Sequence, residues 1–177
     1  MRLGEGSKAM RMAEHPGLPR PQRQLWTEVP RSSSRMVRLA EGEDLFAAIH
    51  SLLDEQGASG ATFFLASGTL ASLTLMTGGP GHETPMTFHG PFAIRAPAAV
   101  LGGAGITGLD EHGMRTSHCH AAFCDADGTT VGGHLIQGGT IAGPGGISIE
   151  LTSFAGAVFV RRNDSETEFV VFHPEPM

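Results

Sequence analysis

The sequence predicts an α+β fold, with a largely antiparallel β-sheet and one main amphipathic helix. Glycine makes up 25 of the 177 residues and charged residues only 17%, a composition that favours tight turns and β structure over helix bundles. Apolar residues recur at helical spacing in one segment and form many short strand-like segments elsewhere. A chain of this length suits one domain with a proper core.

Residues 1–35 are expected to form a flexible basic arm, because they are rich in proline and serine and lack apolar periodicity. The predicted domain spans residues 36–175. It opens with a short strand over 36–39, followed by an amphipathic helix over 43–56 with one apolar face. Gly57 stops this helix.

The remainder of the domain is predicted to be β structure. Glycine and proline separate short apolar or alternating segments, as is typical of antiparallel sheets. Ser67-Gly68 divides the first two strands after the helix. The expected strands cover residues 61–66, 69–76, 87–89, 92–95, 98–101, 115–125, 129–136, 147–151, 157–161 and 168–172.

One predicted hairpin gathers three histidines. Side chains alternate faces along a strand, so His118 and His120 share one face. Ala126-Asp127-Gly128 fits a three-residue loop with glycine in the left-handed conformation, and this register places His134 directly opposite His120. A two-residue loop at Asp127-Gly128 would instead shift the register by one residue and turn His134 to the other face.

Three neutral imidazoles on one face suit a divalent transition metal, and zinc is the first candidate. We therefore predict that His118, His120 and His134 bind a metal ion, with the open fourth position that is typical of catalytic sites. The alternative is that they are ordinary polar residues on a solvated strand face, or that they pack at a subunit contact.

Other patterns in the chain are weaker evidence for a chemical function. The glycines of 103–108 match a dinucleotide-binding spacing, but no helical pattern follows them, so the required strand and helix context is missing. Ser117 and His118 are adjacent on a strand and point to opposite faces, so they form no catalytic pair. Arg115 is a candidate anchor for a small anionic substrate through a bidentate contact, with a surface loop charge as the alternative.

Charge is distributed unevenly along the chain. Residues 1–38 contain eight Lys or Arg and three acids, whereas residues 39–177 contain four arginines and fifteen acids, a net charge of −11. Direct DNA binding by this acidic body is not expected, because nucleic-acid affinity depends mostly on basic contacts to phosphate. Neither a membrane span of roughly 20 apolar residues nor a secretory signal is found. We expect a cytoplasmic protein without membrane contact.

Several short motifs follow the predicted helix in a fixed order: Gly60-Ala-Thr-Phe-Phe64, Gly90-Pro91-Phe92, His118-Cys-His120, Asp127-Gly128 and Gly132-Gly133-His134. Together they resemble the plant and prokaryote conserved (PPC) domain family, in its bacterial type, over about Met36 to Pro174. The resemblance implies a compact α+β fold assembled as a homotrimer, and the DNA-binding description that many bacterial members carry. It also implies that the three histidines of the bacterial family members correspond to His118 and His120 of the H-x-H motif and to His134 of the G-G-H motif.

The fold of that family is similar to that of acetolactate decarboxylase, an enzyme with a histidine-ligated zinc. Similar architecture does not by itself establish a shared function. The chain departs from the family pattern at residues 161–167, which lack the expected Thr-Gly turn. This departure leaves the register of the last strand open.

These observations lead to one main hypothesis and one rival. The main hypothesis is a metal-binding oligomeric protein with a regulatory or DNA-associated role that is exerted through partners. The rival is a metal-dependent lyase or hydrolase that acts on a small carboxylate or carbonyl compound. In the rival, the metal acts as a Lewis acid and Arg115 holds the carboxylate.

Overall fold

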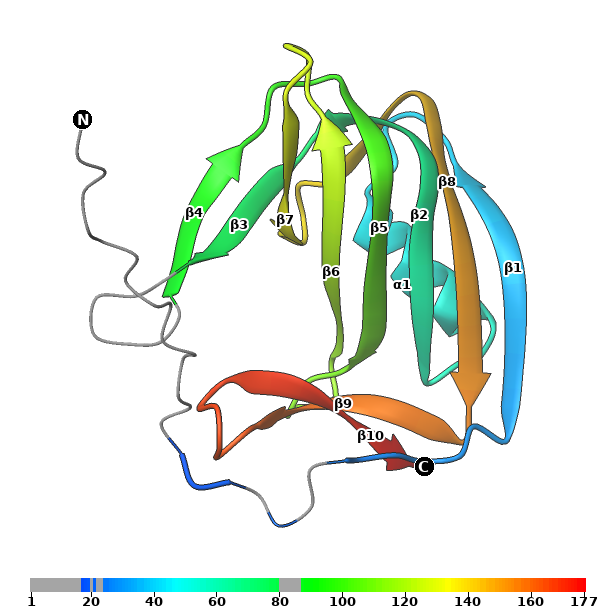
Figure 1. Ribbon diagram of the computed structural model, residues 1–177. Coiled ribbons are helices and arrows are strands. Elements are labelled where there is room, and N and C mark those ends of the chain that lie inside the picture. Colours follow the sequence, from blue (N-terminus) through cyan, green and yellow to red (C-terminus); the bar gives the residue numbers. More distant parts are fainter. Residues whose placement is uncertain (1–16, 20, 22–23, 80–86) are drawn as a thin grey trace, which may run out of the picture.

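The computed structural model describes residues 17–19, 21, 24–79 and 87–177. Within these residues the chain forms one helix and a ten-stranded sheet (Figure 1). The elements are β1 (Arg31–Leu39), α1 (Leu45–Glu55), β2 (Gly60–Ser72), β3 (Thr74–Gly79), β4 (Thr87–Ala93), β5 (Ala98–Leu109), β6 (Arg115–Cys124), β7 (Thr130–Leu135), β8 (Ile141–Ala155), β9 (Ala157–Asn163) and β10 (Val170–Pro176). The predicted α+β class with a largely antiparallel sheet is confirmed.

The single helix, α1, begins and ends where the sequence signals indicate. The Asp44 carboxylate accepts hydrogen bonds from the Phe46 and Ala47 amides at 3.0 and 2.9 Å, and these amides lack partners within the first turn. Gly57 follows the helix with a φ of +59°, a conformation that favours glycine. The apolar face of the helix buries four side chains in the core: Leu45, Phe46, Ile49 and Leu53. No helix in the described part of the chain is long and apolar enough to cross a membrane.

The strands are ordered β1-β8-β2-β5-β6-β7-β3-β4, and the β9–β10 hairpin joins through a parallel contact between β9 and the end of β5. Figure 1 shows the curved sheet with α1 on one side and with β9 and β10 crossing below its central strands. Side chains on the helix face form the core, among them Phe63, Phe123 and Ile149. The opposite face carries exposed hydrophobic side chains, including Met36 and Phe64.

Several strands differ in extent from the prediction, β1, β2 and β5 among them. β1 starts at Arg31, because pairing with the long strand β8 orders residues that were expected in the arm; residues 1–16 of that arm lie outside the described residues. β2 runs through Ser67-Gly68, where bulges in the pairing with β8 take the place of the expected break. β5 continues past Leu101 to Leu109.

The glycines of β5 allow close packing against β2 and β9. A Cβ at Gly105 would lie 2.1 Å from Cζ of Phe63, and a Cβ at Gly108 would lie 2.0 Å from the carbonyl oxygen of Phe159. Side chains at these positions would push β5 away from β2 and β9. The dinucleotide-like spacing therefore lies inside a strand, as its sequence context indicates.

Candidate metal site

The turn between β6 and β7 has the predicted three-residue loop. The Asp125 amide donates to the Thr129 carbonyl oxygen at 2.9 Å, and the Gly128 amide donates to the Asp125 carbonyl oxygen at 3.0 Å. Gly128 has a φ of +80°, in the left-handed region that glycine adopts without strain. The predicted register is confirmed, because His120 lies directly opposite His134.

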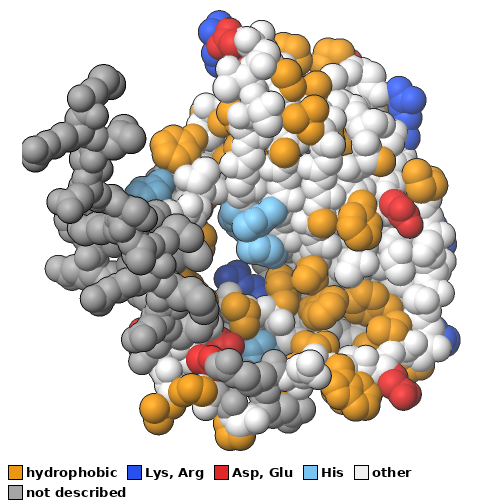
Figure 2. Space-filling view, viewed as in Figure 1, with side chains coloured by type: hydrophobic (Ala, Val, Ile, Leu, Met, Phe, Trp, Pro, Cys, Tyr) orange, Lys and Arg blue, Asp and Glu red, His pale blue; other side chains and the backbone are white. Residues whose placement is uncertain are grey.

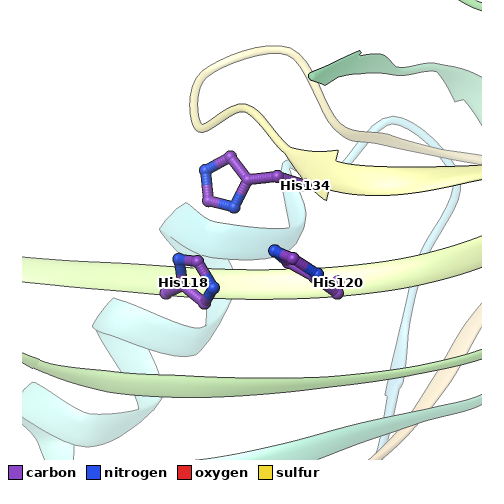
Figure 3. A group of neighbouring side chains, drawn as sticks. All are labelled: His118, His120 and His134. Atoms are coloured by element: carbon purple, nitrogen blue, oxygen red, sulfur yellow. The ribbon is translucent and has the colours of Figure 1, made fainter. Parts of the chain in front are cut away.

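His118, His120 and His134 form a compact group on the sheet face opposite α1 (Figure 3). Their ring centroids lie 4.5 to 5.5 Å apart, and one nitrogen of each ring lies within 4.8 Å of the others. In a tetrahedral zinc site with bonds of about 2.0–2.1 Å, the ligand nitrogens lie roughly 3.3 Å apart. A movement of up to about 1.5 Å between the rings would give that spacing.

The neighbouring strand β3 explains why a glycine precedes His134. Met76 of β3 lies opposite His134 in the sheet, and a Cβ at Gly133 would lie 2.5 Å from the Met76 carbonyl oxygen. A side chain at Gly133 would therefore separate β7 from β3. The G-G-H motif thus combines a close backbone contact with an imidazole on the open face.

The protonation state of the rings fits a metal ion. The pKa of His118 is lowered from 6.5 to about 4, first by loss of hydration and then by the neighbouring His134 and His120. Burial also lowers the pKa of His134, with further contributions from His120 and Arg161. His118 and His134 are therefore neutral at pH 7, which is the form that binds a metal.

A second observation at His134 tests whether the site fits a metal. Its Nδ1 atom is buried and has no hydrogen-bond partner among the described residues. Figure 3 shows this nitrogen on the side of the ring that faces the other two histidines. Since buried polar atoms are normally partnered, a metal ion held between the three rings would supply the contact that Nδ1 lacks. The residues present therefore fit the metal that the sequence predicts.

A cavity of about 580 Å³ lies beside the histidines, a size that suits a small-molecule ligand. Figure 2 shows histidine side chains near the centre of this face, with hydrophobic side chains around them. The polar part of the cavity wall includes His118, His134, Arg161 and Glu168. Hydrophobic side chains of β3, β4 and the β9–β10 hairpin form the apolar part of the wall.

The candidate anchor Arg115 lies away from the histidines, on the helix face of β6. Its guanidinium donates to the Asp54 carboxylate at 2.8 and 3.1 Å and to the Ala58 carbonyl oxygen at 3.0 Å. The arginine that the structure brings to the histidines is Arg161 of β9. Sequence reasoning missed Arg161, because only the packing of the β9–β10 hairpin below the sheet brings it near β6.

Ser117 has a histidine partner that sequence reasoning also missed. Nε2 of His50 and Oγ of Ser117 lie 2.8 Å apart, and the same Oγ lies 2.8 Å from Oγ1 of Thr107. Burial, followed by the charge of Arg115, lowers the pKa of His50. Because Ser117 is buried, this network joins α1 to β5 and β6 behind the three histidines.

Cys119 of β6 adds no reactive group to the site. Both Cys119 and Cys124 are free thiols. Burial raises the pKa of Cys119 to about 12, so its thiol stays protonated at neutral pH and is a poor nucleophile.

Comparison with known proteins identifies relatives of this fold. The model of the Plants and Prokaryotes Conserved (PCC) domain matches residues 27–155. A metal-containing protein from Archaeoglobus fulgidus has a similar structure, with a TM-score of 0.66, 19% identity, and coverage of 85% of this chain and 99% of that protein. A plant- and prokaryote-conserved (PPC) protein from Pyrococcus horikoshii is also similar, with a TM-score of 0.63, 18% identity, and coverage of 85% and 100%.

A third similar structure is a protein from Ralstonia eutropha JMP134 whose description proposes DNA binding. It has a TM-score of 0.60, 21% identity, and coverage of 77% of this chain and 88% of that protein. No curated protein has a matching sequence. At these identities, the similar structures establish the fold.

Proposed function

The chain belongs to the Plants and Prokaryotes Conserved domain family, and on that premise we propose that it binds one divalent metal ion, zinc first, through His118, His120 and His134. The observation that carries the proposal is the convergence of three imidazole nitrogens within 4.8 Å of one another. The unpartnered Nδ1 of His134 supports it. So does the description of the similar Archaeoglobus protein as metal-containing.

A metal-dependent lyase or hydrolase is the second candidate function, and the cavity of about 580 Å³ beside the histidines favours it. Three protein ligands leave an open coordination position, as in catalytic zinc sites. When bound, the ion would supply a Lewis acid for a carbonyl or carboxylate oxygen of a small substrate. The cavity would hold that substrate against the histidine group.

The proposal includes assembly as a homotrimer. The sheet face opposite α1 exposes large hydrophobic side chains at Met36, Phe64 and Leu101, which are 72%, 53% and 56% exposed. Several large hydrophobic side chains left exposed on one sheet face are compatible with a protein–protein interface, and Glu150 lies between Met36 and Phe64 in the sheet.

A regulatory or DNA-associated role would be exerted through partners. The description of the similar Ralstonia protein proposes DNA binding. In this chain, however, residues 39–177 carry a net charge of −11, which disfavours direct contact with DNA phosphates. We also propose a cytoplasmic location. The free thiols of Cys119 and Cys124 are compatible with such a reducing compartment.

Metal analysis of the full chain, purified without a histidine tag, tests the metal proposal. We expect about one zinc per chain in the wild type and a loss of most of it in His120→Ala, since removal of one of three ligands leaves too few donors. His112→Ala is the matched control, because His112 lies exposed beside Glu111 and should leave the metal content unchanged. A metal-free wild type, or equal metal in His120→Ala, would overturn the proposal.

A further inference from the structure

Arg161 differs from the other three arginines of residues 39–177. Arg95 pairs with Asp127, Arg115 with Asp54 and Arg162 with Glu175, each at 2.8 or 2.9 Å. Arg161 makes no salt bridge with any described residue, and it lines the cavity beside His118 and His134.

The positive charge around Arg161 favours the binding of an anion. Its guanidinium is close enough to lower the pKa of both His118 and His134. A metal ion on the histidines would add further positive charge at the same end of the cavity. Among the described residues of the cavity wall, Glu168 is the acidic side chain, and it forms no salt bridge with Arg161. At the polar end of the cavity, Arg161 is thus a cation without an ion pair among the described residues, within a protein whose net charge is −6.

Another part of the cavity wall is apolar. Phe88 and Phe169 meet edge to face with ring centroids 6.2 Å apart, and Val170 and Val171 continue this surface. Three of these side chains, Phe88, Val170 and Val171, are 51%, 47% and 36% exposed. A ligand with an apolar group would cover them and remove their surface from water.

We propose that this cavity binds a small organic carboxylate, with the carboxylate held by the Arg161 guanidinium next to the histidine group and the apolar part against Phe88 and Phe169. The planar guanidinium donates two parallel hydrogen bonds to a carboxylate, which gives both attraction and orientation. The inference rests on the proposed metal site for the second positive charge at the polar end. It assigns to Arg161 the substrate-anchoring role that the sequence suggested for Arg115.

Calorimetric titration of the zinc-loaded full chain with phenylacetate tests this inference. We expect phenylacetate to bind more tightly than acetate, which lacks the apolar group, and than phenylacetamide, which lacks the charge. Arg161→Gln should weaken phenylacetate binding by about ten-fold or more, since a hydrogen-bonded charge pair is lost. Arg161→Lys keeps the charge without the bidentate geometry, so its affinity for phenylacetate should lie between those of the wild type and Arg161→Gln.

Arg162→Gln is the matched control, because it removes the same charge from the next residue of β9, where the side chain bonds to Glu175. It should bind phenylacetate as the wild type does. Equal phenylacetate affinity in wild type and Arg161→Gln, or no binding by the wild type, would overturn the inference.

Zinc content, measured on each protein before titration, separates this inference from the metal proposal. Arg161→Gln should keep its zinc, since Arg161 is not among the proposed ligands. If the wild type holds no zinc, the metal proposal fails. The same titrations on metal-free protein then show whether the cavity binds a carboxylate through Arg161. Phenylacetate binding that depends on Arg161 would then still support the anion site, and binding that does not depend on it would overturn the inference.

Discussion

The neutral state of His118 is set by its surroundings. Loss of hydration and the adjacent imidazoles lower its pKa to about 4, and this keeps a ring nitrogen free for a metal at neutral pH. In the unfolded chain the same residue has a pKa near 6.5. The difference makes the folded state sensitive to acid.

We therefore expect the metal-free protein to lose stability as the pH falls from about 6.5 to about 4. In this window the unfolded chain binds a proton at His118 and the folded protein does not, so folding becomes less favourable with each step toward acid. His118→Gln should reduce this pH dependence. Thermal melting of chelator-treated protein between about pH 6.5 and pH 4 measures the pH dependence of stability, with His112→Gln, at an exposed position, as the control. Identical pH dependence in wild type and His118→Gln would contradict the account.

At the residue scale, the sequence could identify the histidines but not their surroundings. His118 and His120 are two residues apart, so alternation alone places them on one face. Arg161 reaches them through a parallel contact between β9 and the far end of β5, and no local pattern encodes that contact. The helix contact of Arg115 with Asp54 depends on packing of the same non-local kind.

At the scale of elements, the β6–β7 hairpin was predictable because its register is set by a three-residue turn. Gly128 adopts the left-handed conformation that this turn requires. The extents of β1 and β5 were not predictable in the same way. Ser32 to Ser34 are typical of a linker, and they become a strand only because β8 offers a long partner. The glycine-rich part of β5 fits the sheet because Phe63 and the Phe159 backbone lie so close to it that there is no room for a side chain at Gly105 or Gly108.

Two glycines of the hairpin should therefore respond differently to substitution by alanine. Gly128→Ala should cost about 1–2 kcal/mol of stability from the left-handed backbone and leave metal binding intact, because no atom lies within 4 Å of its Cβ position. Gly133→Ala should weaken metal binding, because its Cβ would meet the Met76 carbonyl oxygen at 2.5 Å and displace the strand that carries His134. Chemical denaturation and zinc titration of both variants measure these effects. Unchanged zinc affinity in Gly133→Ala would argue against the role of the β3 contact.

At the scale of the whole molecule, the exposed apolar sheet face predicts self-association. We expect light scattering to give the mass of a trimer, and Phe64→Asp to lower it by placing a charge on the proposed interface. Met114→Asp is the control, since Met114 is also exposed, at 66%, but lies in the turn between β5 and β6. A monomeric wild type, or a trimer unaffected by Phe64→Asp, would show that this face has another role.

The charge distribution predicts weak direct contact with DNA. The full chain should show no tight binding to a duplex at physiological salt, because its body carries a net charge of −11 and would repel phosphates. Any binding at low salt should disappear when residues 1–23 are removed, since five of the basic residues lie there. Fluorescence anisotropy across a salt series tests both points. Tight binding by the shortened chain would contradict the prediction.

We propose above that one metal ion binds to His118, His120 and His134. A crystal structure of the zinc-soaked full chain, with anomalous diffraction recorded on both sides of the zinc absorption edge, tests it most directly. We expect a single strong anomalous peak per chain at about 2.0–2.1 Å from one nitrogen of each of the three rings. Nδ1 of His134, which has no other partner among the described residues, is the nitrogen expected to bind. An anomalous peak elsewhere, or three histidine rings without one, would contradict the claim.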